Sequence, residues 1–257
     1  MRIILFEIFG IQIKSYGLMI AIGIIVASSL FISKGKKNGL DEDSLLNLII
    51  FTVIGGLLGG KLLFIITEFK NILKDPSILF NFGYGFVIYG AILLGALTIY
   101  LYCKRKKWNT LEMIDITAPG LAIAQGFGRI GCFLAGCCYG AETTLNIGVE
   151  FPIGSLAPAG LHLHPTQIYS SIFDFILGFF LLYYGKKKRD IGKVTGLYLI
   201  TYSIGRFLVE FLRNDPRGNV GILSTSQFIA IFTLVAGIII FNIHRLFKGE
   251  NRKIEEA

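Results

Sequence analysis

The sequence predicts an all-α membrane protein with about seven transmembrane helices. Hydrophobic residues make up 53% of the chain and charged residues only 16%, whereas a soluble domain carries about 25% charged residues. The apolar residues lie in separated blocks, each near the roughly 20 residues that a spanning helix needs. The expected helices cover about 17–33, 46–66, 85–103, 113–137, 165–184, 194–213 and 221–243.

Short basic clusters follow every second predicted helix and hold most of the 25 lysines and arginines. They lie at 34–37, 104–107, 186–193 and 245–253. By the positive-inside rule these connections are cytoplasmic, so the N-terminus lies outside and the C-terminus in the cytoplasm. The basic residues behind the net charge of +8 then set the orientation of the helices and contact anionic lipids. We therefore expect no nucleic-acid partner.

The chain reads as one polytopic membrane domain, 1–245, followed by a polar cytoplasmic tail, 246–257, that we expect to be frayed. The first residues show no pattern of a cleavable signal peptide. They predict a short amphipathic segment on the outer surface of the membrane. The longest connection, about 141–163, joins the fourth and fifth helices as an extracytoplasmic loop domain. Its Gly, Pro and Thr content predicts turns and short strands.

Four basic residues fall inside or at the rim of predicted helices rather than in the clusters. A charge at the bilayer centre costs at least about 2.5 kcal/mol, so such residues face polar cavities and mark functional sites. They are Lys61, Arg129, Arg206 and Arg213.

The sixth predicted helix carries a polar stripe in "TYSIGRFLVEFLRND". Tyr202, Arg206, Glu210 and Arg213 follow helical spacing and so share one face. One interpretation is an internal Arg–Glu pair that fixes two helices together. Two arginines for one glutamate favour the other interpretation, an anionic ligand, because a guanidinium matches phosphate oxygens in geometry.

Arg129 strengthens the second interpretation because it lies on another helix, among glycines that permit close backbone approach. The three arginines together predict a pocket for a phospholipid head group. Lys61 either joins this pocket or extends its ammonium group to the membrane–water interface. In "HPTQIY", residues 164–169, Pro165 marks a helix start. Gln167 and Tyr169 then either belong to a helix entry or form a polar rim around the pocket; both interpretations stay open.

The cysteines of "GRIGCFLAGCCYG", residues 128–140, match no zinc or C-x-x-C redox spacing. On a continuous helix Cys132, Cys137 and Cys138 point to different faces, so we expect no metal site. Small packing residues at a helix crossing, or a disulfide involving Cys137 or Cys138, are the alternatives.

Four segments in this order, "SYGLM", "GRIGCFLAGCCYG", "HPTQIY" and "RFLVEFLRND", resemble the bacterial prolipoprotein diacylglyceryl transferases over about residues 10–243. The first cysteine of "GCFLAGCC" stands where the family motif usually has asparagine, and this segment resembles a cysteine-bearing branch grouped with the same enzymes. That family transfers a diacylglyceryl group from phosphatidylglycerol to the lipobox cysteine thiol in the signal peptide of a preprolipoprotein. The product is a thioether and the leaving group is glycerol phosphate.

The resemblance implies roles for named positions of this chain. Catalysis would fall to Arg129, Arg206, Glu210 and Tyr89, the last at the place where the family commonly has a histidine that activates the thiol. By the same match, substrate binding would involve Tyr16, Tyr202 and Arg213. From their places in the sequence we add Lys61, Cys132 and Gln167 to the expected substrate-binding residues. No cofactor or metal is implied, and the resemblance indicates a multi-pass protein of the bacterial cytoplasmic (inner) membrane.

Three functions follow, of which the first is the main hypothesis. In the first, the chain would act as the resembled transferase family does, and its expected partners are phosphatidylglycerol, preprolipoprotein signal peptides and the membrane. Alternatively, it is a related membrane enzyme that uses its own cysteines on another lipid or thiol substrate. The third is a non-catalytic phospholipid-binding or transport protein, against which the lack of a discernible inverted repeat speaks.

Overall fold

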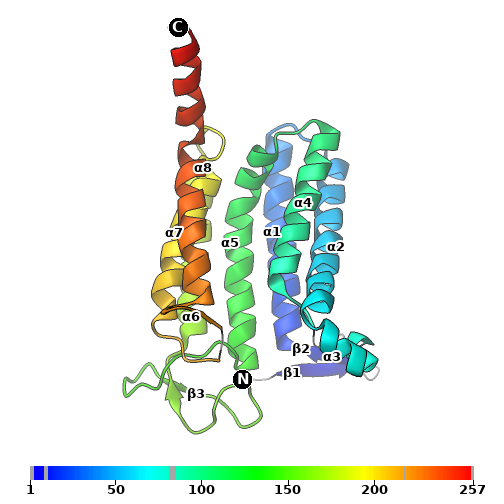
Figure 1. Cartoon of the computed structure of the whole chain (residues 1–257), viewed down its shortest axis with the longest axis vertical. Coiled ribbons are helices and arrows are strands. Elements are labelled where there is room, and N and C mark those ends of the chain that lie inside the picture. The colour runs from blue at the N-terminus through cyan, green and yellow to red at the C-terminus, as the bar shows by residue number, and fades with distance from the viewer. Residues whose placement is uncertain (1–2, 9–10, 81–84, 217, 256–257) are drawn as a thin grey trace. The chain divides into compact units, whose positions relative to one another are not determined.

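The structure, a computed structural model, describes residues 3–8, 11–80, 85–216 and 218–255. Within these residues the chain is mostly helical, and each predicted apolar block corresponds to one long helix (Figure 1). The long helices are α1 (Ser15–Lys37), α2 (Glu42–Thr67), α4 (Ile88–Lys106), α5 (Thr110–Ala135), α6 (Thr166–Tyr184), α7 (Lys193–Glu210) and α8 (Thr225–Glu255).

Four of the helices in the described ranges are long and apolar enough to cross a membrane, namely α1, α2, α6 and the Thr225–Ile243 part of α8. They confirm a helical membrane protein. The other long helices are less apolar because they carry charges: α4 ends in Lys104–Lys106, α5 holds Arg129, and α7 holds Arg206 and Glu210.

Several predicted helix ends are wrong by a few residues, and two of these differences matter for the site. Helix α5 stops at Ala135 rather than 137, where Gly136 takes a positive φ of 72° that ends a helix readily. Helix α7 stops at Glu210, so Arg213 lies beyond it. The expected frayed tail is helical as far as Glu255, and residues 256–257 lie outside the described residues.

The chain divides into two compact units. The large unit comprises Met1–Phe31 and Ile114–Ala257, and the small unit comprises Ile32–Met113. The small unit also holds the short helices α3 (Phe69–Lys74) and η1 (Pro76–Phe80). Each unit is described separately below.

In the small unit, α2 and α4 lie side by side and approach closely through glycines (Figure 1). A Cβ atom at Gly59 would lie only 2.3 Å from the carbonyl oxygen of Gly90 on α4. Small residues at such a crossing let two backbones meet, which is how helices pack where lipid removes the hydrophobic driving force. Asp41 begins α2, since its carboxylate accepts a hydrogen bond from the Ser44 N–H at 2.9 Å.

This crossing gives the first prediction. We expect Gly59→Ala to destabilise the full chain by about 1–3 kcal/mol, because the new methyl group meets backbone rather than a movable side chain. Gly56→Ala is the matched control on the same helix, since its Cβ would lie 3.7 Å from the nearest atom, the Ala91 carbonyl oxygen. Thermal unfolding in detergent measures both. Equal melting temperatures for the two variants would contradict the close packing.

In the large unit, the N-terminal part of α1 packs on α5 through small residues. A Cβ at Gly23 would lie 3.0 Å from the Ala124 carbonyl oxygen, and one at Gly120 would lie 3.1 Å from the Ala27 Cα. Helix α7 lies between α6 and α8 (Figure 1). The carboxylate of Asp115 on α5 accepts hydrogen bonds from the Gly192 and Thr195 N–H groups at 2.6 and 2.7 Å, so a side chain of α5 caps α7.

Three short antiparallel hairpins complete the large unit. The N-terminal lead-in forms strands β1 (Ile4–Ile8) and β2 (Ile11–Lys14). The predicted short strands of the 141–163 loop are confirmed as β3 (Val149–Glu150) and β4 (His162–Leu163). Leu163 of β4 packs with Phe151 and Ala157 in a small buried core. Strands β5 (Asn219–Val220) and β6 (Leu223–Ser224) precede α8.

Candidate active site

The arginine and the glutamate of α7 form a buried ion pair, as their i, i+4 spacing predicts. Arg206 Nη1 donates to Glu210 Oε2 at 2.6 Å, and Arg206 Nη2 donates to the Ser226 hydroxyl of α8 at 2.7 Å. The Glu210 side chain is only 4% exposed. Through the bond from Arg206 to Ser226, the buried pair of α7 also connects this helix to α8.

Arg213 lies beyond the end of α7 but stays beside Glu210. Its Nη1 is 4.0 Å from Glu210 Oε2, and its guanidinium donates to both oxygens of Asp215 at 3.1 and 3.0 Å. An antiparallel bridge to Gly140 fixes the backbone here, with the Ala141 N–H donating to Leu212 and the Asn214 N–H donating to Tyr139. The predicted polar stripe thus remains together, although its last member is held by a bridge rather than a helix.

Arg129 differs from the other two arginines because no carboxylate holds it. Across the described residues, its guanidinium forms neither a hydrogen bond nor a salt bridge within 4 Å. It lies within electrostatic range of Tyr202, Cys132, Cys138 and Asp174. Arg206 lies in range of both Arg129 and Arg213, so the three arginines form one group, here called the arginine cluster.

Asp174 on α6 belongs to this site and was missed from the sequence. Its side chain is buried, at 2% exposure, within electrostatic range of Arg129 and Arg206. The signal was a lone aspartate inside the predicted apolar helix 165–184. With Asp174 and Asp215 added, three carboxyl groups lie beside the three arginines, and Glu210 and Asp215 hold two of these arginines. What remains for an anion is the unpaired guanidinium of Arg129.

Two tyrosines border the arginine cluster. Tyr202 stacks on Tyr198 with ring centroids 5.6 Å apart, and it lies within electrostatic range of Arg129 and Arg206. Tyr16, near the start of α1, lies within range of Arg129 and of the three cysteines at the end of α5. Both sequence-predicted tyrosines of the large unit therefore adjoin the predicted arginines.

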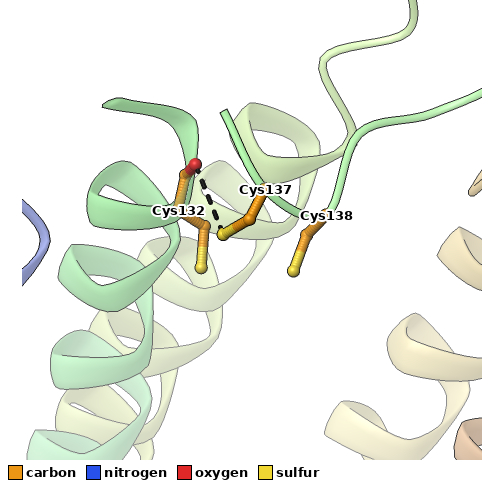
Figure 2. A group of neighbouring side chains, drawn as sticks. All are labelled: Cys132, Cys137 and Cys138. Carbon is orange, nitrogen blue, oxygen red and sulfur yellow. Dashed lines mark hydrogen bonds between the residues drawn. The ribbon is translucent and has the colours of Figure 1, made fainter. Parts of the chain in front are cut away.

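The three cysteines converge, contrary to the expectation that they point apart (Figure 2). Their Sγ atoms all lie within 4.8 Å of one another. The reason is the early end of α5: after Gly136 the chain folds back, the Cys137 N–H donates to the Cys132 carbonyl at 3.1 Å, and Cys138 adopts a φ of 62°. These three residues are called the cysteine cluster.

The cysteine cluster adjoins the arginines. Hydrogen bonding with the thiols of Cys132 and Cys137 lowers the pKa of the Cys138 thiol from its ordinary value, and the nearby guanidiniums of Arg213 and Arg129 act in the same direction against the effect of burial. A thiol in such a setting is favoured as the thiolate.

The "HPTQIY" segment holds the turn that carries Cys137 and Cys138. The Thr166 hydroxyl donates to the Cys138 carbonyl and Gln167 Nε2 donates to the Cys137 carbonyl, each at 2.7 Å. Gln167 is only 1% exposed, and its Oε1 has no hydrogen-bond partner among the residues described. The predicted helix entry is confirmed, and its side chains contact the cysteine turn directly.

This contact gives the second prediction. We expect Thr166→Val, which keeps the shape but leaves the Cys138 carbonyl without its donor, to cost about 1–3 kcal/mol. Maleimide should then label Cys137 and Cys138 faster. Ser170→Ala is the control, because the Ser170 hydroxyl bonds only the carbonyl one turn earlier, at Thr166. Unchanged labelling in Thr166→Val would show that this hydroxyl does not hold the turn.

Two other predicted site residues, Lys61 and Tyr89, lie in the small unit. Lys61 Nζ lies 5.2 Å from the centroid of the Phe64 ring, a cation–π contact within α2. Tyr89 lies in the first turn of α4 with its side chain partly exposed.

The site of the large unit thus combines three guanidiniums, two of them held by carboxylates, with three thiols and two tyrosines at one end of α5. Guanidiniums in a poorly hydrated cavity stabilise a phosphate that gains negative charge far more than they would in water. The arrangement can therefore bind a phosphate ester and stabilise a phosphate leaving group.

Known proteins resemble the chain over nearly its whole length. The sequence model of the prolipoprotein diacylglyceryl transferase family matches residues 3–243. A Clostridium perfringens protein called phosphatidylglycerol–prolipoprotein diacylglyceryl transferase 2 is 63% identical over the full length of both chains. Clostridium tetani and Clostridioides difficile transferases of the same name, without the number, are 58% and 34% identical over 96% and 98% of this chain and 100% and 98% of their own.

Proposed function

The chain belongs to the prolipoprotein diacylglyceryl transferase family, and we propose that it transfers the diacylglyceryl group of phosphatidylglycerol to the lipobox cysteine thiol of preprolipoproteins. The thiol sulfur bonds to the glycerol carbon that carries the phosphate, and glycerol phosphate leaves. This is the first step of bacterial lipoprotein maturation. The names of the relatives state both substrates, phosphatidylglycerol and the prolipoprotein.

We further propose that all seven long helices cross the bacterial cytoplasmic membrane as one polytopic domain, with the N-terminus outside and the C-terminus in the cytoplasm. The alternation of basic clusters supports this orientation. It places the 141–163 loop, and the end of α5 that carries the site, on the extracytoplasmic side. A signal peptide exported through the membrane presents its lipobox on that side.

The observation that carries the proposal is the unpaired guanidinium of Arg129 next to carboxylate-held Arg206 and Arg213. Arg206 and Glu210 give the cluster a fixed geometry, since neither can move without breaking a buried 2.6 Å hydrogen bond. Arg129 remains able to take the phosphate of phosphatidylglycerol. Arg213, Tyr202, Tyr16 and Gln167 would then line the lipid head group and the incoming peptide.

Lys61 enters the proposal as a cation inside a predicted helix, and Tyr89 enters it through the position where the family commonly has a histidine. Lys61 would contribute a further cation to the lipid head group, and Tyr89 would hydrogen-bond the substrate thiol.

The proposal is tested in cells depleted of their own transferase. The full chain is expressed with a lipobox reporter protein, and mass spectrometry measures the reporter. We expect the mass of one diacylglyceryl group to be added at the lipobox cysteine. A reporter with serine at that position is the control and should stay unmodified. An unmodified cysteine reporter, with the chain present in the membrane, would contradict the function.

A turnover assay separates the enzyme from a lipid-binding protein. Purified chain is mixed with phosphatidylglycerol labelled in its head group and a synthetic lipobox peptide. We expect glycerol phosphate to be released in large molar excess over the protein. Binding of one labelled lipid per chain without release would instead indicate a non-catalytic phospholipid-binding protein.

A further inference from the structure

We propose that Cys132, Cys137 and Cys138 form a three-thiolate site for a thiophilic divalent cation, Zn²⁺, whose fourth coordination position takes the thiol of the substrate. The metal site itself stands on geometry alone; the identity of the fourth ligand rests on the proposed function. Figure 2 shows the three side chains converging at the end of α5, with their Sγ atoms within 4.8 Å of one another.

The spacing of the sulfurs suits zinc. A Zn–S bond is about 2.3 Å long, which places two sulfurs of a tetrahedral site about 3.8 Å apart. Each sulfur pair therefore has to close by about 1 Å at most, which small side-chain rotations supply. A simple packing role does not require three thiols to meet at one point.

The number of ligands indicates a site with an open position. In the part of the chain that the structure describes, the group holds three ligand atoms and no fourth from His, Cys, Asp or Glu. Structural zinc sites are closed by four protein ligands, whereas catalytic sites have three and leave one position for water or substrate. The cysteine cluster belongs to the second kind.

The surrounding charges favour a metal thiolate. Three thiolates and one Zn²⁺ carry a net charge of −1, which would be costly to bury alone. Arg129 lies within electrostatic range of Cys132 and Cys138, and Arg213 lies within range of Cys138. The guanidinium of Arg129, which no carboxylate contacts among the described residues, offsets this single charge.

The backbone around the ligands is also fixed in advance. Thr166 and Gln167 each bond the carbonyl of one ligand cysteine, and the next residues, Tyr139 to Ala141, pair with Leu212 to Asn214. Groups that orient the ligands in this way raise metal affinity, because less conformational freedom is lost on binding. The ligating turn is thereby tied to both α6 and the residues after α7.

The metal would solve the chemical difficulty of the proposed reaction, which is that a neutral thiol is a weak nucleophile. A thiol that coordinates the cation loses its proton to solvent and stays bound as the thiolate. Its sulfur then forms the C–S bond to the glycerol carbon while the C–O bond to phosphate breaks, and the electron pair leaves with glycerol phosphate. The zinc keeps its charge throughout, and the neutral thioether binds it weakly and departs.

Metal binding is tested without any substrate. The full chain is purified in detergent under reducing conditions, and its zinc content is measured by mass spectrometry of the metal. We expect about one Zn²⁺ per chain, replaceable by Co²⁺ with the intense absorption of thiolate-to-cobalt charge transfer. Changing Cys132, Cys137 and Cys138 together to serine should abolish both signals. Cys103→Ala, which removes a buried thiol outside the cluster, should change neither.

A failure to bind Zn²⁺ or Co²⁺ in the reduced protein would overturn the proposal, as would a disulfide within the cluster in protein isolated from cells without oxidation. Because unfolding of the triple variant would imitate metal loss, the wild-type chain is also stripped with a chelator and reloaded. We expect the cobalt absorption to disappear and return.

Activity tests the fourth ligand. Stripped wild-type protein should lose transfer to the lipobox peptide at least tenfold and regain it with Zn²⁺ but not with Mg²⁺. Full transfer by the stripped protein would overturn the substrate-binding role. A failure of the proposed function would give another result, which the same assay distinguishes. The zinc-loaded wild-type chain would then bind metal but modify no lipobox peptide.

Discussion

Replacing Arg129 by alanine lowers the rate of diacylglyceryl transfer at least about 100-fold, the loss expected when one preorganised donor to a developing anion is removed. Arg129 is the guanidinium that no carboxylate neutralises among the described residues, so its charge is available to the phosphate. If it acts mainly on the leaving group, kcat and kcat/KM fall together, because the interaction is stronger in the transition state than in the bound substrate.

Two further variants sharpen this result. Arg129→Lys keeps the charge but not the planar two-point geometry, and we expect an intermediate rate. Arg105→Ala removes an exposed arginine from the basic end of α4 and should transfer at the wild-type rate. Steady-state assays with phosphatidylglycerol and a lipobox peptide measure all three. Near wild-type kcat in Arg129→Ala would remove this residue from the reaction.

The stability of Arg129→Ala provides an independent check. A residue whose role is to hold helices together lowers the melting temperature when it is truncated, whereas a residue kept for a ligand lowers activity alone. We expect the melting temperature in detergent to change little, because no hydrogen bond of the Arg129 side chain is lost within the described structure.

The helices and the polar stripe of α7 could be predicted because both depend on local pattern. Blocks of apolar residues near membrane length indicate helices regardless of what they contact. The i, i+4 spacing of Arg206 and Glu210 brings their side chains together on any helix, and the 2.6 Å hydrogen bond agrees. The grouping of Arg129 with them followed from its charge at membrane depth, since nothing local relates α5 to α7.

The cysteine cluster could not be predicted because it depends on one helix end. On a continuous helix the sulfurs of Cys132, Cys137 and Cys138 diverge. Gly136 takes a positive φ and ends α5 two residues early, so the chain folds back and the sulfurs meet. Helix boundaries are set by caps and tertiary contacts, here those of Thr166 and Gln167, which a local pattern does not contain.

Asp174 was overlooked for a different reason. It is a carboxylate rather than a cation, and a carboxylate in an apolar helix is equally costly and equally informative. Its carboxyl group lies within electrostatic range of both Arg129 and Arg206, so it belongs to the charge arrangement of the site.

The ion pair of Arg206 and Glu210 gives the second large effect, this time on stability. Arg206→Ala and Glu210→Ala should each destabilise the chain by about 3–5 kcal/mol, because each leaves a buried charge without its nearest partner. The double variant removes both charges, so we expect it to be more stable than the sum of the single losses predicts. The difference is the coupling energy of the pair.

The exposed pair of Lys36 and Glu42 in the small unit is the matched control. Its single and double alanine variants should show a coupling of at most about 1 kcal/mol, because solvent screens both charges. Chemical unfolding in detergent measures both cycles. Additive losses for Arg206 and Glu210 would contradict a buried coupled pair.

Activity then separates the two roles that the pair combines. If Arg206 and Glu210 served only to join α7 to α8, the partly restabilised double variant would recover transfer along with its fold. Because Arg206 also lies within electrostatic range of Arg129, where we place the phosphate, we expect the double variant to regain stability and remain inactive. Recovery of transfer in the double variant would reduce the pair to a helix contact and leave Arg129 and Arg213 to stabilise the leaving group.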